Sequence, residues 1–365
     1  MRKPMKFHVI NTGGTLGMVG KPLVPAASAE ELLEGIKVPK GVKLNLQDMD
    51  EKQDSTNVWN ADRLVMGQMI EAAYETHDAF IVLHGTDSLA ETCSYLSMLF
   101  KLSLQKPVFV IGAQMTKIEA GSDVAMQIEN ALRVAKSFVK NSIVGVYNVC
   151  IGEVLHGARV CKRRDSAFDA FHTPGVHPVA HAFPHIMIKE GVRRKDEVTA
   201  VQGLRLDSKF ERHVVSLVVS ADAPPYVLMD MVKAGRIRGV VLECKGAGNI
   251  PDRPWETEGD DAFSWIDAIR AATDAGIHVG IVSPFEDGRV ILDRYGLGAK
   301  AKAAGALSLE SMTPPMADTK FRQAIAMFPK DPARIQRFLS ADMLNELLDG
   351  FEDESDEDDD EVVKD

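Results

Sequence analysis

Hydrophobic and polar residues follow one another along this chain in two alternating patterns. Short apolar runs of four to six residues, typical of strands buried on both faces, are separated by stretches in which apolar residues recur every three or four positions, as in helices. Repeated strand–helix–strand units of this length predict parallel strands with helices on both faces of the sheet. The expected strands are 7–10, 42–46, 79–83, 108–111, 143–147, 214–219, 239–242 and 278–282.

The helical stretches carry apolar residues along one side. Leu89, Cys93, Leu96 and Phe100, for example, are spaced as a stripe that faces a core. Ser28 followed by Glu31 forms a capping box, which predicts a helix from there to about residue 36. The polar stretch 47–57 is expected to be a loop. Further helices are expected at 61–74, 89–100, 125–139, 225–234 and 261–275, with more toward the C-terminus.

Two changes in this rhythm predict the domain organisation. From Ser142 the strands follow one another closely without intervening helices, and the stretch 189–207 is polar and lacks helical periodicity. We therefore expect an N-terminal α/β domain over 1–190, a linker over 191–212, a smaller C-terminal α/β domain over 213–348, and an acidic tail over 349–365. The length of 365 residues suffices for two such domains.

The charge is concentrated in the tail. Residues 349–365 carry a net charge of −10, which leaves −1 of the total of −11 for the rest of the chain. A tail of this composition is expected to be disordered and solvated. Nucleic-acid binding is disfavoured because the body has no basic stripe, and a membrane span because no apolar run approaches the required ~20 residues. The four cysteines lack metal-ligand spacing, as expected for reduced thiols in a cytoplasmic protein.

Two small polar turns carry the candidate chemistry. Thr15 lies in Asn-Thr-Gly-Gly-Thr-Leu-Gly directly after the strand 7–10, and Thr86 lies in His-Gly-Thr-Asp-Ser directly after the strand 79–83. Ligands of open α/β sheets bind outside the carboxyl ends of the strands, so both threonines are expected in one site. Each turn alone also fits an ordinary strand–helix connection. A dinucleotide cradle is disfavoured because the glycine spacing is not G-x-G-x-x-G.

These turns resemble the two signature blocks of the bacterial-type L-asparaginase family. Asp54-Ser55-Thr56 resembles the substrate-binding block of that family, and Gly157–Lys162 with Phe168–Phe171 resembles the catalytic-lysine segment of its cytoplasmic, type I branch. Gly246–Asn249 and Met312-Thr313 resemble landmarks toward the C-terminus. The resemblance spans roughly residues 6 to 328. It implies a two-domain α/β fold that assembles as a homodimer or homotetramer.

The resemblance also implies an activity, the hydrolysis of L-asparagine to L-aspartate and ammonia through a threonine nucleophile and an acyl-enzyme. Thr15 would be the nucleophile, and Thr86, Asp87 and Lys162 the accompanying relay. A lysine desolvated beside Thr86 is expected to have a lowered pKa and to act as a base. No cofactor and no metal are expected. The residues implied in substrate or oxyanion binding are Asp54, Ser55, Thr56, Asp87, the backbone N–H groups of Thr86 and Ala113, and Asn249.

A missing loop tyrosine and the acidic tail keep other hypotheses open. The loop after Thr15 lacks the tyrosine that related asparaginases commonly carry, and Leu23 occupies about that place. The second hypothesis is therefore a binding or regulatory protein, which holds an amino acid without useful turnover. The third is the asparaginase-like subunit of a tRNA-dependent amidotransferase, which the near-neutral body and the short stretch before Thr15 disfavour. A zinc site at His172, His177, His181 and His185 is not expected, because prolines interrupt their spacing.

Overall fold

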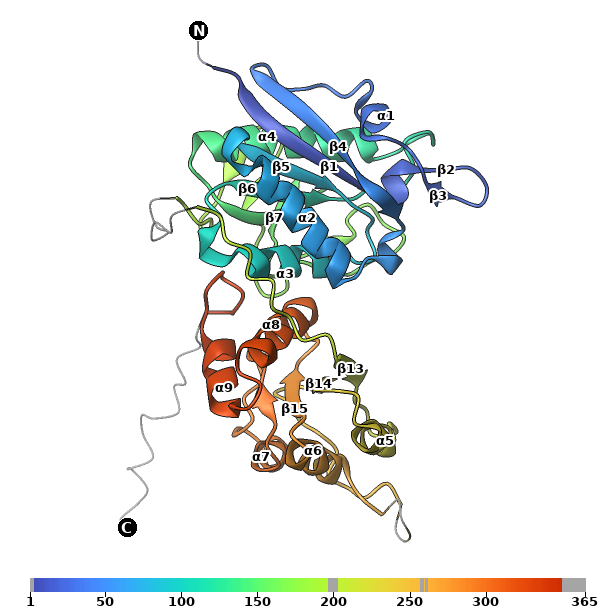
Figure 1. Cartoon of the computed structure of the whole chain (residues 1–365), viewed down its shortest axis with the longest axis vertical. Coiled ribbons are helices and arrows are strands. Elements are labelled where there is room, and N and C mark those ends of the chain that lie inside the picture. The colour runs from blue at the N-terminus through green and yellow to red at the C-terminus, as the bar shows by residue number, and fades with distance from the viewer. Residues whose placement is uncertain (1–2, 196–202, 257–258, 260–261, 350–365) are drawn as a thin grey trace, which may run out of the picture.

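The computed structural model describes residues 3–195, 203–256, 259 and 262–349, which form two α/β domains (Figure 1). The larger N-terminal domain is built on a mostly parallel sheet with helices on both faces, and the smaller C-terminal domain on a parallel sheet with helices. The fold class expected from the hydrophobic pattern is thus confirmed. The tail residues 350–365 and part of the expected linker lie outside the described residues.

The N-terminal sheet has eight strands in the order β12-β11-β8-β7-β6-β5-β1-β4. The five strands from β4 to β7 are parallel to one another, and the three beyond β7 are antiparallel. The parallel strands are β1 (Met5–Gly13), β4 (Val42–Gln53), β5 (Ala79–Leu83), β6 (Pro107–Ile111) and β7 (Gly145–Cys150). The antiparallel strands are β8 (Glu153–His156), β11 (Ala180–His181) and β12 (Met187–Ile188).

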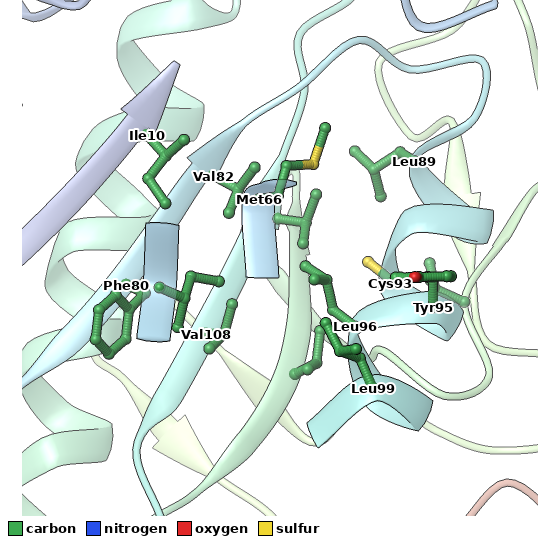
Figure 2. Close-up of a cluster of buried hydrophobic side chains, with 14 of the residues drawn as sticks. Ile10, Met66, Phe80, Val82, Leu89, Cys93, Tyr95, Leu96, Leu99 and Val108 are labelled. Carbon is green, nitrogen blue, oxygen red and sulfur yellow. The ribbon is translucent and has the colours of Figure 1, made fainter. Parts of the chain in front are cut away.

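Helices cover both faces of this sheet. On one face α2 (Asn60–Ala73) and α3 (Leu89–Phe100) pack on β1, β5 and β6, and Figure 2 shows this core around Phe80, Val82 and Leu96. On the other face α1 (Ala29–Leu33) and α4 (Val124–Lys140) enclose a second core. Burial on both faces explains why the central strands are almost purely apolar in sequence.

One strand is longer than its hydrophobic pattern predicts. β4 continues to Gln53, so the expected loop 47–57 is wrong for its first seven residues. Among the described strands β4 pairs only with β1, over Val42–Asp48 and again at Gln53, and over its first half its side chains alternate between partly buried and exposed positions. An edge strand tolerates polar residues because one face meets water. The capping box of Ser28 and Glu31 is present, although α1 ends at Leu33 and is shorter than expected.

The C-terminal domain contains four parallel strands in the order β13-β14-β15-β16. The strands are β13 (Val214–Val218), β14 (Gly239–Glu243), β15 (His278–Val282) and β16 (Leu307–Ser308). The helices are α5 (Tyr226–Ala234), α6 (Trp265–Asp274), α7 (Gly296–Ala303), α8 (Pro314–Met327) and α9 (Pro332–Ser340). None of the helices within the described ranges combines the length and the apolar character needed to span a membrane.

The two domains meet through α3 and α8 (Figure 1). Met98 of α3 lies in the same buried cluster as Met316 and Phe321 of α8. The buried Gln323 of α8 donates to the carbonyl oxygens of Met98, at 3.3 Å, and Asp207, at 2.9 Å. Helix α3 begins just after the Thr86 turn, so this contact brings the C-terminal domain close to the candidate site.

The acidic tail is expected to be dispensable for folding. The last described residue, Asp349, is held through its carbonyl oxygen by Arg289. Deleting residues 350–365 keeps this contact and removes only the segment whose composition cannot supply a core. The melting temperature of the shortened chain should match that of the full chain in a thermal unfolding scan. A clear drop would show that the tail docks on the body.

Candidate active site

The two threonine turns are in direct backbone contact. Strands β1 and β5 are parallel neighbours, with Asn11 opposite Leu83, so both turns leave the same edge of the sheet. Gly14 has φ of +80°, and a Cβ added to it would lie 2.2 Å from the Cα of Gly85. Only glycine permits this approach. Thr15 and Thr86 are the next residues of the two turns, so the structure brings them to one place.

Thr15 begins a single 3₁₀ turn, Thr15–Gly17, and its side chain is half-buried. The turn is anchored by the N–H of Gly14, which donates to the carbonyl of Gln53 at 2.9 Å. A hairpin of β2 (Met18–Val19) and β3 (Val24–Pro25) follows. Leu23 lies in the turn of this hairpin with about half of its side chain exposed, so an aliphatic residue stands at the expected tyrosine position.

Lys162 connects the second threonine to two carboxylates. It lies on β9 (Cys161–Lys162), which pairs with β10 (Phe171–His172) to form a two-stranded ribbon. Lys162 Nζ donates to Thr86 Oγ1 at 3.2 Å, Asp87 Oδ1 at 2.6 Å and Asp165 Oδ1 at 3.1 Å. Three donated bonds use all three protons of an ammonium group.

The pKa of Lys162 is raised, which contradicts the expected lowering. Burial by itself lowers the pKa, but the hydrogen bonds and negative charges of Asp87 and Asp165 outweigh that effect. Conversely, the hydrogen bond from Lys162 lowers the pKa of Asp87. At neutral pH the pair is therefore a cation and a carboxylate. Without a ligand, Lys162 is not a neutral base.

The segment Asp54–Thr56 packs against the Asp87 turn. The buried Ser55 accepts the N–H of Asp87 on its Oγ at 3.0 Å, and Thr56 Oγ1 donates to Asp87 Oδ2 at 3.2 Å. Asp54 Oδ1 accepts the N–H of Thr56 at 2.9 Å and so closes the local turn. The three residues expected in substrate binding thus lie beside Asp87.

Gly112, the neighbour of Ala113, lies against the Thr86 turn, whereas Asn249 is placed elsewhere. A Cβ added to Gly112, the residue before the buried Ala113, would lie 3.0 Å from Thr86 Cγ2. Asn249 lies in a turn of the C-terminal domain and lines a cavity of about 1460 Å³ there. None of the other predicted site residues lines that cavity.

A chain of buried side chains that sequence reasoning missed supports the Thr86 turn. Arg63 Nε donates to Thr92 Oγ1 at 3.1 Å, Thr92 Oγ1 donates to His84 Nε2 at 3.0 Å, and His84 Nδ1 donates to the carbonyl of Gly85 at 2.7 Å. Burial lowers the pKa of His84 to about 4, so the ring is neutral. Because the peptide unit is planar, holding the Gly85 carbonyl also fixes the direction of the Thr86 N–H.

Comparison with known proteins assigns the whole arrangement to one family. Residues 6–192 match the model of the N-terminal asparaginase domain, and residues 213–339 match that of the glutaminase/asparaginase C-terminal domain. The chain belongs to the asparaginase family. Together the two asparaginase-family matches cover most of the chain, including each predicted site residue.

Individual relatives are similar over most of this chain. L-asparaginase 1 of Escherichia coli is 27% identical over 93% of this chain and 97% of its own. A glutamyl-tRNA(Gln) amidotransferase component of Aeropyrum pernix is 29% identical over 88% of this chain and 74% of its own. The structure of the thermostable L-asparaginase of Thermococcus kodakarensis superimposes with a TM-score of 0.82 at 24% identity, covering 95% of this chain and 100% of that one.

The histidines of the segment 172–185 do not gather into a metal centre. Within the described parts of the chain, no three His, Cys, Asp or Glu side chains are placed so that they could hold a metal ion. His172 instead pairs with Glu286 of the C-terminal domain at 3.0 Å.

Proposed function

We propose that the chain is an amidohydrolase that converts L-asparagine to L-aspartate and ammonia. The observation that carries this proposal is the contact of Lys162 Nζ with both Thr86 Oγ1 and Asp87, next to a turn that supplies Thr15 through the Gly14–Gly85 contact. An amide carbon is a poor electrophile, and this arrangement supplies a nucleophile, a proton relay and a fixed charge around one point. The family match supports the same chemistry.

In the proposed reaction, Thr15 Oγ forms a bond to the amide carbon. The negative oxygen that develops is held by the N–H groups of Thr86 and Ala113, neither of which donates to a backbone carbonyl within the described residues. The C–N bond then breaks, and the proton lost by Thr15 passes through Thr86 and Lys162 to the leaving nitrogen, which departs as ammonia. Water hydrolyses the resulting ester and releases aspartate.

Substrate binding would turn Lys162 into a better proton carrier. The α-ammonium group of asparagine is proposed to bind Asp87 and Asp54, and its α-carboxylate Ser55 and Thr56. An ammonium group at Asp87 competes with Lys162 for the same carboxylate. Weakening this ion pair lowers the pKa of Lys162, so that a larger fraction of the lysine is neutral and able to accept a proton only in the loaded site.

We further propose a homodimer or homotetramer in the cytoplasm. Asn249 lies outside the site of its own chain, so its proposed part in substrate binding requires a second copy. All four cysteines are free thiols and three of them are buried, which supports a reducing compartment.

The direct test is ammonia release from purified protein. With millimolar L-asparagine we expect ammonia above the buffer rate, and a slower release from L-glutamine. If folded protein releases no ammonia from either amide, the amidohydrolase proposal is wrong. Calorimetric binding of aspartate in that case would favour an amino-acid-binding protein, which the leucine at the tyrosine position would then explain.

A second candidate is a component of a tRNA-dependent amidotransferase, because a relative of that kind is 29% identical. This candidate predicts a complex with tRNA, which an electrophoretic mobility shift at low salt would detect. The net charge of −1 for the chain before residue 349 does not favour it. Binding of tRNA together with weak release of ammonia from free asparagine would favour this second candidate.

A further inference from the structure

Arg159 is a buried cation three residues before Lys162. Only 1% of its surface is exposed. Its Nε and Nη2 both donate to the carbonyl oxygen of Pro174, at 3.1 and 2.8 Å. Arg159 precedes β9 and Pro174 follows β10, so the guanidinium group closes the base of the ribbon that carries Lys162.

The other side of the same guanidinium group reaches the C-terminal domain. Arg159 Nη1 donates to the carbonyl oxygens of Ser311, at 3.0 Å, and Glu346, at 2.6 Å. Ser311 lies in the loop before α8, and Glu346 lies in the segment 341–349 that follows α9. All four of these bonds end on backbone carbonyls. The planar guanidinium group has five N–H donors and can bond carbonyl oxygens on several sides at once. A lysine, with three donors on one nitrogen, could make only some of these bonds.

The segment 341–349 is itself firmly anchored. The carboxylate of Glu346 pairs with Lys320 of α8 at 2.6 Å, and both side chains are fully buried. The same carboxylate accepts the N–H of Leu344 at 2.6 Å, and the N–H of Leu348 donates to Ser311 Oγ at 2.7 Å. The match to the family's C-terminal model ends at residue 339, before this segment.

We propose that Arg159 is a positioning residue for Lys162. It ties the base of the β9–β10 ribbon to Ser311 and to the segment 341–349, and thereby holds Nζ of Lys162 against Thr86 and Asp87. This inference deepens the proposed amidohydrolase function and rests on it for its kinetic consequence. Displacement of a reacting group by about 1 Å can lower the rate on the order of 10²-fold. A shift of the base of the ribbon, which would displace Lys162, is therefore expected to lower kcat.

The test compares Arg159→Met and Arg159→Lys with Arg289→Met as a matched control. Arg289 also donates to carbonyls of the same segment, those of Leu348 and Asp349, but these bonds do not involve the ribbon. Loss of Arg159 should lower kcat about 10- to 100-fold, less for the lysine variant, with KM changed much less. Arg289→Met should keep kcat within about twofold. If Arg159→Met does not fold, Arg159→Lys decides.

Two further readouts separate positioning from simple loss of stability. Asp87 and Asp165 form ion pairs with Lys162. Lys162 and Asp87 also line a cavity of about 390 Å³ between the domains, whose other titratable side chains are Glu91, Arg159, Cys161, His172 and Glu286. A loosened ribbon weakens the ion pair, which lowers the pKa of Lys162 and raises that of Asp87. Asp87 must be ionised to hold the α-ammonium group of the substrate, so the acid limb of the kcat/KM profile should move to higher pH. A smaller folded fraction would instead lower kcat/KM by the same factor at every pH and leave the shape of the profile unchanged.

The second readout needs no activity. A free lysine amine is acylated by acetic anhydride in proportion to its neutral fraction, which rises about tenfold for each unit of pKa lost. Mass spectrometry should show faster labelling of Lys162, relative to the exposed Lys233, in the Arg159 variants and not in Arg289→Met. This result would support the positioning role even if the wild-type protein releases no ammonia. Unchanged labelling in folded Arg159 variants would overturn it.

Discussion

Thr15→Ala is expected to abolish turnover, with a loss on the order of 10²-fold or more, while aspartate still binds. The substitution removes the hydroxyl that attacks the amide carbon. It leaves the Gly14–Gly85 contact and the Asp54–Thr56 segment in place, so the pocket that holds the ligand should be preserved. Ammonia release measures the chemical step, and calorimetric titration of aspartate measures binding.

Two related variants sharpen this test. Thr15→Ser keeps a hydroxyl and should retain measurable turnover, whereas Thr15→Val keeps nearly the same shape without one and should behave like alanine. If Thr15→Ala keeps most of its activity, Thr86 becomes the better nucleophile and the assignment of the two threonines is reversed.

Lys162→Met should reduce turnover by a similar factor, on the order of 10²-fold. The lysine holds Thr86 Oγ1 and Asp87 together, and methionine keeps much of its volume without the charge or the donors. Steady-state kinetics should show the loss mainly in kcat.

The double variant Thr15→Ala with Lys162→Met should be little worse than either single one, because residues that act as a unit lose their effect together. Losses that multiply instead would mean that the two residues contribute to separate steps.

The strands that sequence predicted best are among those buried on both faces, although the equally buried β7 (Gly145–Cys150) is shifted from the predicted range 143–147. β5 and β15 begin and end at the predicted residues, because a run of five buried positions has no polar interruption to blur its limits. The edge strand β4 shows the converse. Its second half is polar, since one face meets solvent, and a one-dimensional pattern cannot separate such a strand from a loop.

The site residues that closely follow a strand in the sequence could be predicted. The contacts between residues far apart in the sequence could not. Thr15 and Thr86 each lie just after a buried strand, and such a position can be recognised from the neighbouring residues in the sequence. The partners of Lys162 and Arg159 are set by tertiary packing, with Asp87 75 positions before Lys162 and Glu346 187 positions after Arg159. The sign of the Lys162 pKa shift depends on two such neighbours, so no spacing in the sequence could have supplied it.

The contact between Arg159 and Glu346 also sets an order of events during synthesis. At about 5 to 20 residues per second, the ribosome needs roughly 10 to 40 s to add the 187 residues that separate them. The N-terminal sheet can form in that interval, but the base of its ribbon stays without two of its carbonyl partners. We therefore expect a nascent chain to acquire its complete lysine site only after residue 346 has left the ribosome, whatever the folding rate of its first domain.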